Sequence, residues 1–127
     1  MHENEIAKQV VDAAFKVHSH FGPGLFEIVY EVSLVHELRE RGLTVVRQTP
    51  IPIRYGSVVF EEGFRADVIV EGKVLLELKS LEQIARLHKK QVLTYLRLLD
   101  LQLGLLINFG EEYIKDGILR IVNGLKA

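Results

Sequence analysis

Two carboxylates and a lysine interrupt a stretch of the sequence that otherwise has the Val, Ile and Leu content of a β-hairpin. Asp67 stands before the predicted turn, and Glu77 and Lys79 stand after it. Paired carboxylates hold hard divalent cations such as Mg²⁺, which prefer oxygen ligands. Lys79 follows Glu77 by two residues and therefore lies beside it on one face of a strand. Together these residue types are what metal-assisted cleavage of a phosphodiester requires.

The length of the turn near Gly72 decides whether the two carboxylates share a face of the hairpin. A two-residue loop would place Asp67 and Glu77 on opposite faces. A three-residue loop, which pairs Ile69 with Lys73, places both on one face. The opposite face is then entirely apolar and consists of Ala66, Val68, Val70, Val74, Leu76 and Leu78. We therefore expect this register, with the two carboxylates within diagonal reach across the strands.

For a strand pair taken alone, the simpler interpretation of these charges is a set of cross-strand salt bridges on a solvated face. Other residues favour a site. Gln91 and Tyr95 are four residues apart on a predicted helix and share one side of it with His88. This polar stripe could face the carboxylates or could be a solvated helix face. Glu27 begins another predicted helix, where it could cap the helix dipole or deliver a third acidic ligand.

The elements that position these residues follow from the spacing of apolar residues and from chain breakers. Helical spacing predicts helices over residues 5–20, 25–41 and 81–99. The last of these is expected to bury Ile84, Leu87, Val92, Leu96 and Leu99. Strand-like composition predicts strands over residues 44–55, 58–70, 73–79, 104–109 and 118–122. Pro50 and Pro52 make the first strand irregular, with a turn at Tyr55-Gly56 and a bend at Glu62-Gly63. The order ααβββαββ predicts an α/β domain.

The bulk composition indicates one folded domain over residues 1–127. Its hydrophobic fraction of 48% and charged fraction of 26% suit a single core. The sequence has no cysteine, which rules out thiolate metal sites and fits a cytoplasmic location. No apolar run approaches the roughly 20 residues of a membrane span, and the first residues lack a signal-peptide layout. With a formal net charge of −1, any polyanion must meet basic residues that are gathered locally or supplied by a partner.

Further motifs lie around these residues in a recognisable order. Gly24-Leu-Phe-Glu27-Ile-Val-Tyr30 precedes Asp67 and Glu77-Leu-Lys79, and Gln91-Val-Leu-Thr-Tyr95 follows. With this set the chain resembles the PD-(D/E)XK nuclease superfamily and, more closely, the small bacterial proteins of the GxxExxY family. The match covers nearly the whole chain. One departure is Ala66, which replaces the proline of the motif and affects the shape of the strand rather than the chemistry.

The resemblance implies a restriction-endonuclease-like αβββαβ core, with a mixed central sheet flanked by helices, an extra N-terminal helix and an extra C-terminal strand. It implies that Mg²⁺ or Mn²⁺ is bound by Asp67, Glu77 and the carbonyl of Leu78. Lys79 would orient or activate the attacking water and stabilise charge at the phosphate. The other catalytic residues that it implies are Glu27, Gln91 and Tyr95. The substrate contacts that we expect from it are Arg65, His88, Lys89 and Tyr30.

The function that follows is a metal-dependent nuclease, with DNA favoured over RNA as the substrate. One alternative is a non-catalytic module that keeps the fold and binds nucleic acid or protein. Another is a structural domain with a salt-bridged polar face and no response to metal. The small size and near-neutral charge favour a homodimer or a larger assembly. Phosphate could be met by basic residues that could equally be solvated charges, namely Arg65, Lys73, Arg86, Lys89 and Lys90.

Overall fold

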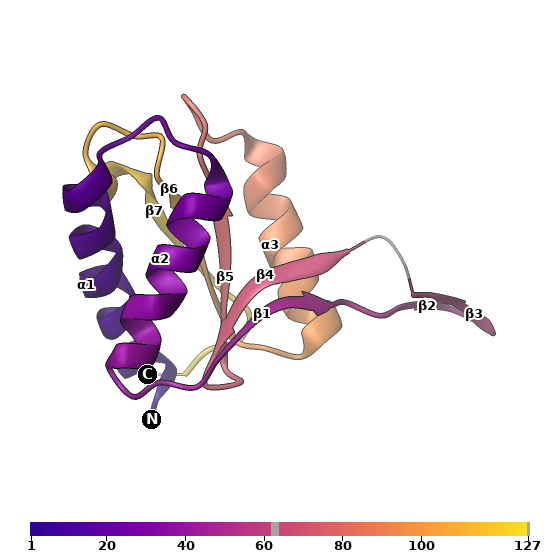
Figure 1. Ribbon diagram of the computed structural model, residues 1–127. Coiled ribbons are helices and arrows are strands. Elements are labelled where there is room, and N and C mark those ends of the chain that lie inside the picture. Colours follow the sequence, from indigo (N-terminus) through magenta and orange to yellow (C-terminus); the bar gives the residue numbers. More distant parts are fainter. Residues whose placement is uncertain (62–63, 127) are drawn as a thin grey trace.

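Residues 1–61 and 64–126, which the computed structural model describes, form helices packed on a five-stranded sheet and a separate two-stranded hairpin (Figure 1). In chain order the elements are α1 (Glu3–Phe21), α2 (Glu27–Glu40), β1 (Val45–Pro50), β2 (Ile53–Tyr55), β3 (Val58–Phe60), β4 (Arg65–Val70), β5 (Val74–Lys79), α3 (Arg86–Leu99), β6 (Leu103–Asn108), the short 3₁₀ helix η1 (Ile114–Gly117) and β7 (Ile118–Val122). None of the described helices is both long and apolar enough to span a membrane.

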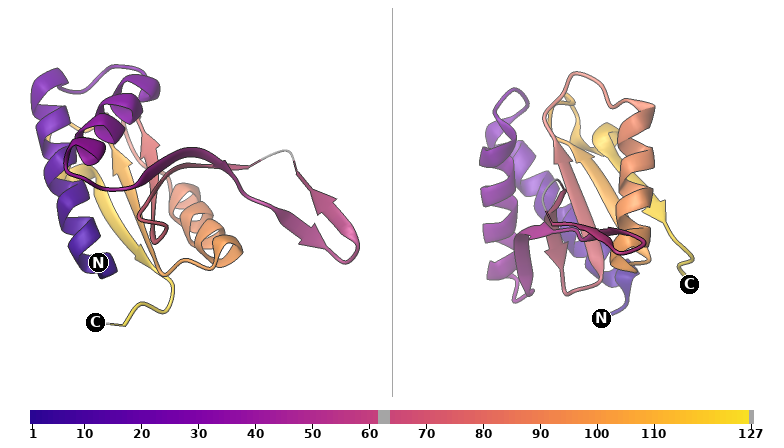
Figure 2. Two further views of the ribbon diagram at one scale, coloured as in Figure 1. Left: turned by 60° about the horizontal axis from the view of Figure 1, so that its bottom comes forward. Right: turned by 90° about the vertical axis from the view of Figure 1, so that its right-hand side faces the viewer.

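The large sheet is mixed and has the strand order β1-β4-β5-β6-β7. Only β5 and β6 pair in parallel, and the other neighbours are antiparallel. A parallel pair needs a crossover connection, and α3 supplies it between β5 and β6. Helices α1 and α2 cover one face of the sheet and α3 covers the other (Figure 2). The expected α/β architecture, with a mixed central sheet flanked by helices, is confirmed.

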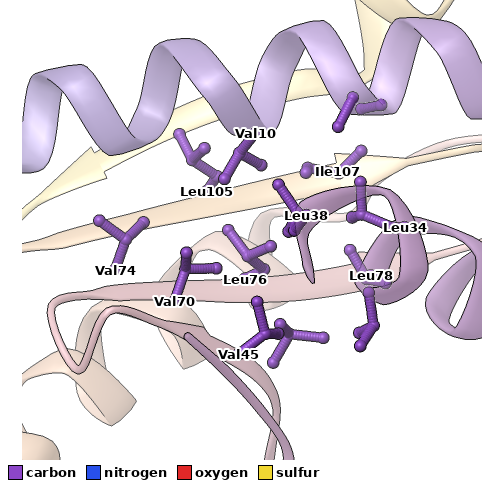
Figure 3. Packing of buried hydrophobic residues seen from close by; sticks show 14 of the residues in the cluster. Val10, Leu34, Leu38, Val45, Val70, Val74, Leu76, Leu78, Leu105 and Ile107 are labelled. Atoms are coloured by element: carbon purple, nitrogen blue, oxygen red, sulfur yellow. The ribbon is translucent and has the colours of Figure 1, made fainter. Parts of the chain in front are cut away.

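The larger core lies between the sheet and the pair α1 and α2 (Figure 3). Val10 of α1 and Leu34 and Leu38 of α2 are fully buried there against alternate residues of the strands. The strand residues on this side include Val68, Val70, Leu76 and Leu78. Burying one such side chain is worth about 1.5–3 kcal/mol. Because strand residues alternate between faces, this core fixes the intervening residues of β4 and β5 toward α3.

Helix α3 packs directly on β6 at Gly104. Val92 and Leu96 are buried against Leu106 and the neighbouring strands. The close approach depends on Gly104 of β6, where a Cβ atom would lie 2.8 Å from the Cγ1 atom of Val92. The absence of a side chain at this one position therefore brings the helix down onto the strands.

The hairpin β2–β3, here called the arm, extends away from the body of the molecule (Figures 1 and 2). Ile53 pairs with Phe60 and Tyr55 with Val58. Gly56 adopts a left-handed φ of 59° in the connecting turn, which glycine tolerates without strain. The expected turn at Tyr55-Gly56 is confirmed.

Several predicted boundaries are wrong. The expected strands 44–55 and 58–70 are each divided in two, and the expected bend at Glu62-Gly63 lies outside the described residues. The third helix begins at Arg86 rather than at residue 81. The side-chain amide of Asn108 bonds both the main-chain N–H and the C=O of Leu81, at 2.9 Å each, and so holds that residue outside the helix. Leu87, which we expected to be buried, is 61% exposed because it lies on the outer side of α3.

The register of the hairpin β4–β5 differs from the prediction by two residues. Val70 pairs with Val74, so the loop consists of Glu71, Gly72 and Lys73. Glu71 adopts a φ of 54°, its N–H donates to the carbonyl of Thr44 and its carboxylate accepts the N–H of Thr44. These bonds to Thr44, which precedes β1, hold Glu71 in the turn and so favour the observed register. Rules for an isolated hairpin do not take such a contact into account. A shift of two residues keeps every side chain on its predicted face.

Candidate active site

A polar cleft of about 210 Å³ lies between α3 and the strands β4 and β5. It is lined by the predicted trio Asp67, Glu77 and Lys79, together with Phe64, Arg65, His88, Gln91, Val92, Tyr95 and Leu106. A larger hollow of about 690 Å³ lies between α1 and α2, but its lining is mainly apolar and contains no pair of carboxylates. The cleft is therefore where the charged residues singled out from the sequence meet.

The two carboxylates are each fixed by the main chain of the opposite strand. The N–H of Leu78 donates to Oδ2 of Asp67 at 2.8 Å, and the N–H of Asp67 donates to Oε1 of Glu77 at 3.3 Å. These contacts continue the hairpin beyond its last backbone pair, Val68 with Leu76. The two acidic side chains are therefore held next to one another by the strands that carry them.

The surroundings of Glu77 disfavour its charge. Its side chain is only 6% exposed. Burial and the neighbouring Asp67 charge raise the pKa of Glu77 to about 9, and the Lys79 charge lowers it by less. Within residues 1–61 and 64–126, no salt bridge joins Asp67 or Glu77 to a basic side chain. The expected alternative of a solvated, salt-bridged face is therefore wrong.

This donor set fits a hard divalent cation. Both side chains offer only oxygen atoms, which Mg²⁺ and Mn²⁺ prefer. A cation bound beside Glu77 would also offset the cost of ionising this buried carboxyl next to Asp67. In the described part of the chain, no group of three or more His, Cys, Asp or Glu side chains is arranged to hold a metal. A bound ion would therefore need main-chain oxygen or water in addition to Asp67 and Glu77.

Lys79 ends β5 and lines the cleft half-buried. The parallel partner strand holds it, since Lys79 pairs with Asn108 and its carbonyl accepts the N–H of Phe109 at 2.8 Å. The Lys79 charge lowers the pKa of both Glu77 and Glu27. The Lys79 ammonium group therefore favours the ionised form of both Glu77 and Glu27.

Helix α3 brings three of the predicted side chains to the cleft, namely His88, Gln91 and Tyr95. His88 also accepts the N–H of Ala85 on Nδ1 at 3.0 Å, which caps the start of the helix. Burial raises the pKa of the Tyr95 hydroxyl, and the charges of Glu77 and Asp67 raise it further. Tyr95 is therefore a hydrogen-bond donor at neutral pH.

Glu27 lies beside the pair rather than within it. Partial burial raises the pKa of its carboxyl, the Lys79 charge lowers it, and the Asp67 and Glu31 charges raise it. Glu27 is not part of the cleft lining. The structure therefore puts Glu27 within electrostatic range of the site without making it a third member of the carboxylate group.

Tyr30 is not placed to contact a substrate, so that expectation is wrong. Its side chain is fully buried and stacks on Phe109 with the ring centroids 4.6 Å apart. Its hydroxyl donates to the carbonyl of Gly22 at 2.6 Å and accepts the N–H of Leu25 at 3.1 Å. Tyr30 instead holds the loop that leads into α2 and thus Glu27, which explains why this helix begins two residues later than predicted.

Three other predicted positions are distributed around the cleft. Arg65 lines it, and its Nη1 atom donates to the carbonyl of Gln48 at 3.3 Å. Lys89 is exposed on α3 outside the lining. Leu78 is buried, and its N–H is used by Asp67.

Sequence reasoning missed a polar network around the buried carboxylate of Glu31. Glu31 accepts two hydrogen bonds from Arg47, at 2.9 and 2.6 Å, and one from Gln48 at 2.9 Å. Gln48 has a φ of 52° and lies between the pairs that align β1 with β4, across from Asp67. The network thus braces the strand that carries Asp67. The signal in the sequence was that Glu31 and Gln48 fit the pattern of the family that the chain resembles, without any indication that the two side chains meet. Phe64 was also missed, although it lines the cleft.

Comparison with known proteins identifies one family. A family model described as the PD-(D/E)XK nuclease superfamily matches residues 4–121, which include every residue of the cleft. No curated protein and no solved structure gives a match.

Proposed function

Because the chain belongs to the PD-(D/E)XK nuclease superfamily, we propose that it is a metal-dependent nuclease that hydrolyses phosphodiester bonds, with DNA favoured over RNA. The observation that carries this proposal is the adjacent pair Asp67 and Glu77, held in one cleft with Lys79. The motif Gly24-Leu-Phe-Glu27-Ile-Val-Tyr30 supports assignment to the GxxExxY branch.

In this proposal Asp67, Glu77 and the carbonyl of Leu78 hold Mg²⁺ or Mn²⁺. A bound divalent ion lowers the pKa of its water and neutralises charge on the phosphate. The burial of Glu77 supports the assignment, because this carboxyl is costly to ionise without a cation nearby. Metal binding should therefore release a proton and strengthen as pH rises.

The neighbouring side chains would act on the substrate and the attacking water. Lys79 orients the water and donates to a phosphate oxygen where negative charge develops. Tyr95 donates from a hydroxyl that keeps its proton, and Gln91 positions the substrate beside it. Glu27 acts on the same site through its charge. Arg65 and His88 contact flanking phosphates.

The distribution of charge supports a nucleic-acid substrate despite the net charge of −1. Helix α3 contains no acidic residue within Arg86–Leu99, and its exposed basic side chains are Arg86, Lys89, Lys90 and Arg97. In the described residues none of them forms a salt bridge. The basic charge that a phosphate backbone requires is thus concentrated on the helix that covers the cleft. The small chain would complete its substrate surface as a homodimer or in a larger assembly.

A cleavage assay on labelled single-stranded DNA, duplex DNA and RNA in Mg²⁺ tests this function. Lys79→Ala should lower the rate by about 10²–10³-fold, the usual cost of one transition-state donor. The exposed Lys8 on α1 provides a matched control, and Lys8→Ala should cleave as the wild type does. Cleavage by Lys79→Ala at the wild-type rate would refute the assignment. Binding of nucleic acid without cleavage would favour a non-catalytic module.

A further inference from the structure

An apolar groove of about 270 Å³ lies beside the cleft, between α3 and the base of the arm. It shares Phe64, Gln91 and Tyr95 with the cleft, so the two hollows adjoin one another. The rest of its lining is Ile53, Leu87, Lys90, Thr94 and Leu98. A chain molecule bound at the carboxylates would therefore have this groove next to it.

The walls of the groove expose apolar surface to water. Leu87 is 61% exposed and Leu98 is 39% exposed, and both lie on the side of α3 away from the buried Val92 and Leu96. The helix thus has a second apolar stripe that the core does not use. Contiguous exposed apolar surface next to a polar site is typical of a ligand-binding groove.

Aromatic rings and basic groups border this apolar surface. Phe64 and Tyr95 lie with their ring centroids 5.8 Å apart at the junction of groove and cleft. Lys90 lies in the lining, and α3 contains only basic charges. Aromatic platforms next to a basic track are how proteins bind single-stranded nucleic acid, because bases stack on the rings while phosphates meet the cations.

We propose that this groove binds unpaired bases next to the phosphate that is cleaved, so that the substrate is a single strand or a splayed end. The proposal rests on the proposed nuclease function. A duplex presents phosphates and stacked pairs to the protein, and extruding one base from it costs a few kcal/mol. An unpaired strand can place its bases against Leu87, Leu98 and Phe64 without that cost.

The test is fluorescence anisotropy in EDTA, which prevents metal-dependent turnover. The probes are a labelled oligothymidine of about 12 nucleotides, within the size of common single-strand sites, and a blunt duplex of the same length. The wild type should bind the single strand at least about five-fold more tightly than the duplex, the lower limit for stacking one base. The double variant Leu87→Gln/Leu98→Gln should lose that difference while duplex binding is unchanged. Glutamine keeps helix propensity and neutral charge.

Val32→Gln is the matched control, since Val32 is an exposed apolar residue of α2 on the opposite face of the sheet. Three results would refute the proposal that the groove binds unpaired bases. They are equal binding of both probes by the wild type, binding of neither probe, and an unchanged preference for the single strand in the double variant. The nuclease function is judged separately by cleavage that depends on Lys79. If the protein cleaves nucleic acid but gives any of those three binding results, the nuclease function stands and the role of the groove in binding bases is refuted.

Discussion

Replacing Glu77 by glutamine should remove a large pH dependence from the stability of the metal-free protein. The folded-state pKa of Glu77 is raised from 4.5 to about 9. Between these values the native protein holds a proton that the unfolded chain releases. The contribution of this group to wild-type stability is therefore complete below pH 4.5 and is lost as pH rises toward 9. Glutamine does not titrate, so the stability of Glu77→Gln should not fall with rising pH on account of this residue.

The magnitude follows from the width of that window. From about pH 5 to about pH 8 the unfolding free energy of Glu77→Gln should rise relative to wild type by about 3–4 kcal/mol, at about 1.4 kcal/mol per pH unit. A change of that size is a substantial part of the 5–15 kcal/mol that stabilises a typical domain. In a domain of this size it shifts Tm by on the order of 10 °C.

Denaturant unfolding across this pH range in EDTA measures the effect. Glu40→Gln is the control, because Glu40 is an exposed glutamate at the end of α2. Its difference from wild type should stay flat within about 0.5 kcal/mol, as for most surface substitutions. If the curves of wild type and Glu77→Gln ran parallel across the whole range, the buried carboxyl of Glu77 would not carry the energetic cost assigned to it.

Two further predictions concern the scaffold of the site. Tyr30→Phe removes two part-buried hydrogen bonds, one to the carbonyl of Gly22 and one from the N–H of Leu25, and should cost about 1–3 kcal/mol by denaturant unfolding, whereas the same change at the exposed Tyr55 should cost nothing measurable. Gly104→Ala forces a Cβ atom against Val92 and should lower stability by about 1–3 kcal/mol. A double-mutant cycle with Val92→Ala should show favourable coupling, and strict additivity would contradict the close packing of α3.

The faces of the central hairpin could be predicted because they depend only on alternation. Asp67 and Glu77 reached one side of the sheet because their neighbours Val68, Leu76 and Leu78 belong to the core. The register could not be predicted, since it depends on the bonds between Glu71 and Thr44, which are distant in sequence. Local rules determine which side a strand residue faces, and long-range contacts determine what lies opposite it.

The roles of single polar residues were harder to predict for a related reason. A tyrosine suits both a core and a binding surface, so the sequence motif at Tyr30 did not reveal that its hydroxyl bonds the loop before α2. Leu87 satisfied the helical pattern but lies on the outer side of α3. The network around Glu31 joins residues 16 and 17 positions apart across two elements, a distance over which spacing carries no signal.

Isothermal titration of Mg²⁺ and Mn²⁺ tests the central claim most directly. Asp67→Asn is a better variant than alanine, because the asparagine oxygen can still accept the N–H of Leu78. We expect the wild type to bind metal, Lys79→Ala to bind it as well, and both Asp67→Asn and Glu77→Gln to lose affinity by more than about 100-fold, beyond the roughly 10–100-fold that changes to residues around the ligands cost. Equal metal binding by the wild type and both carboxylate variants, or none by the wild type, would contradict the assignment of Asp67 and Glu77 as the metal ligands of a nuclease.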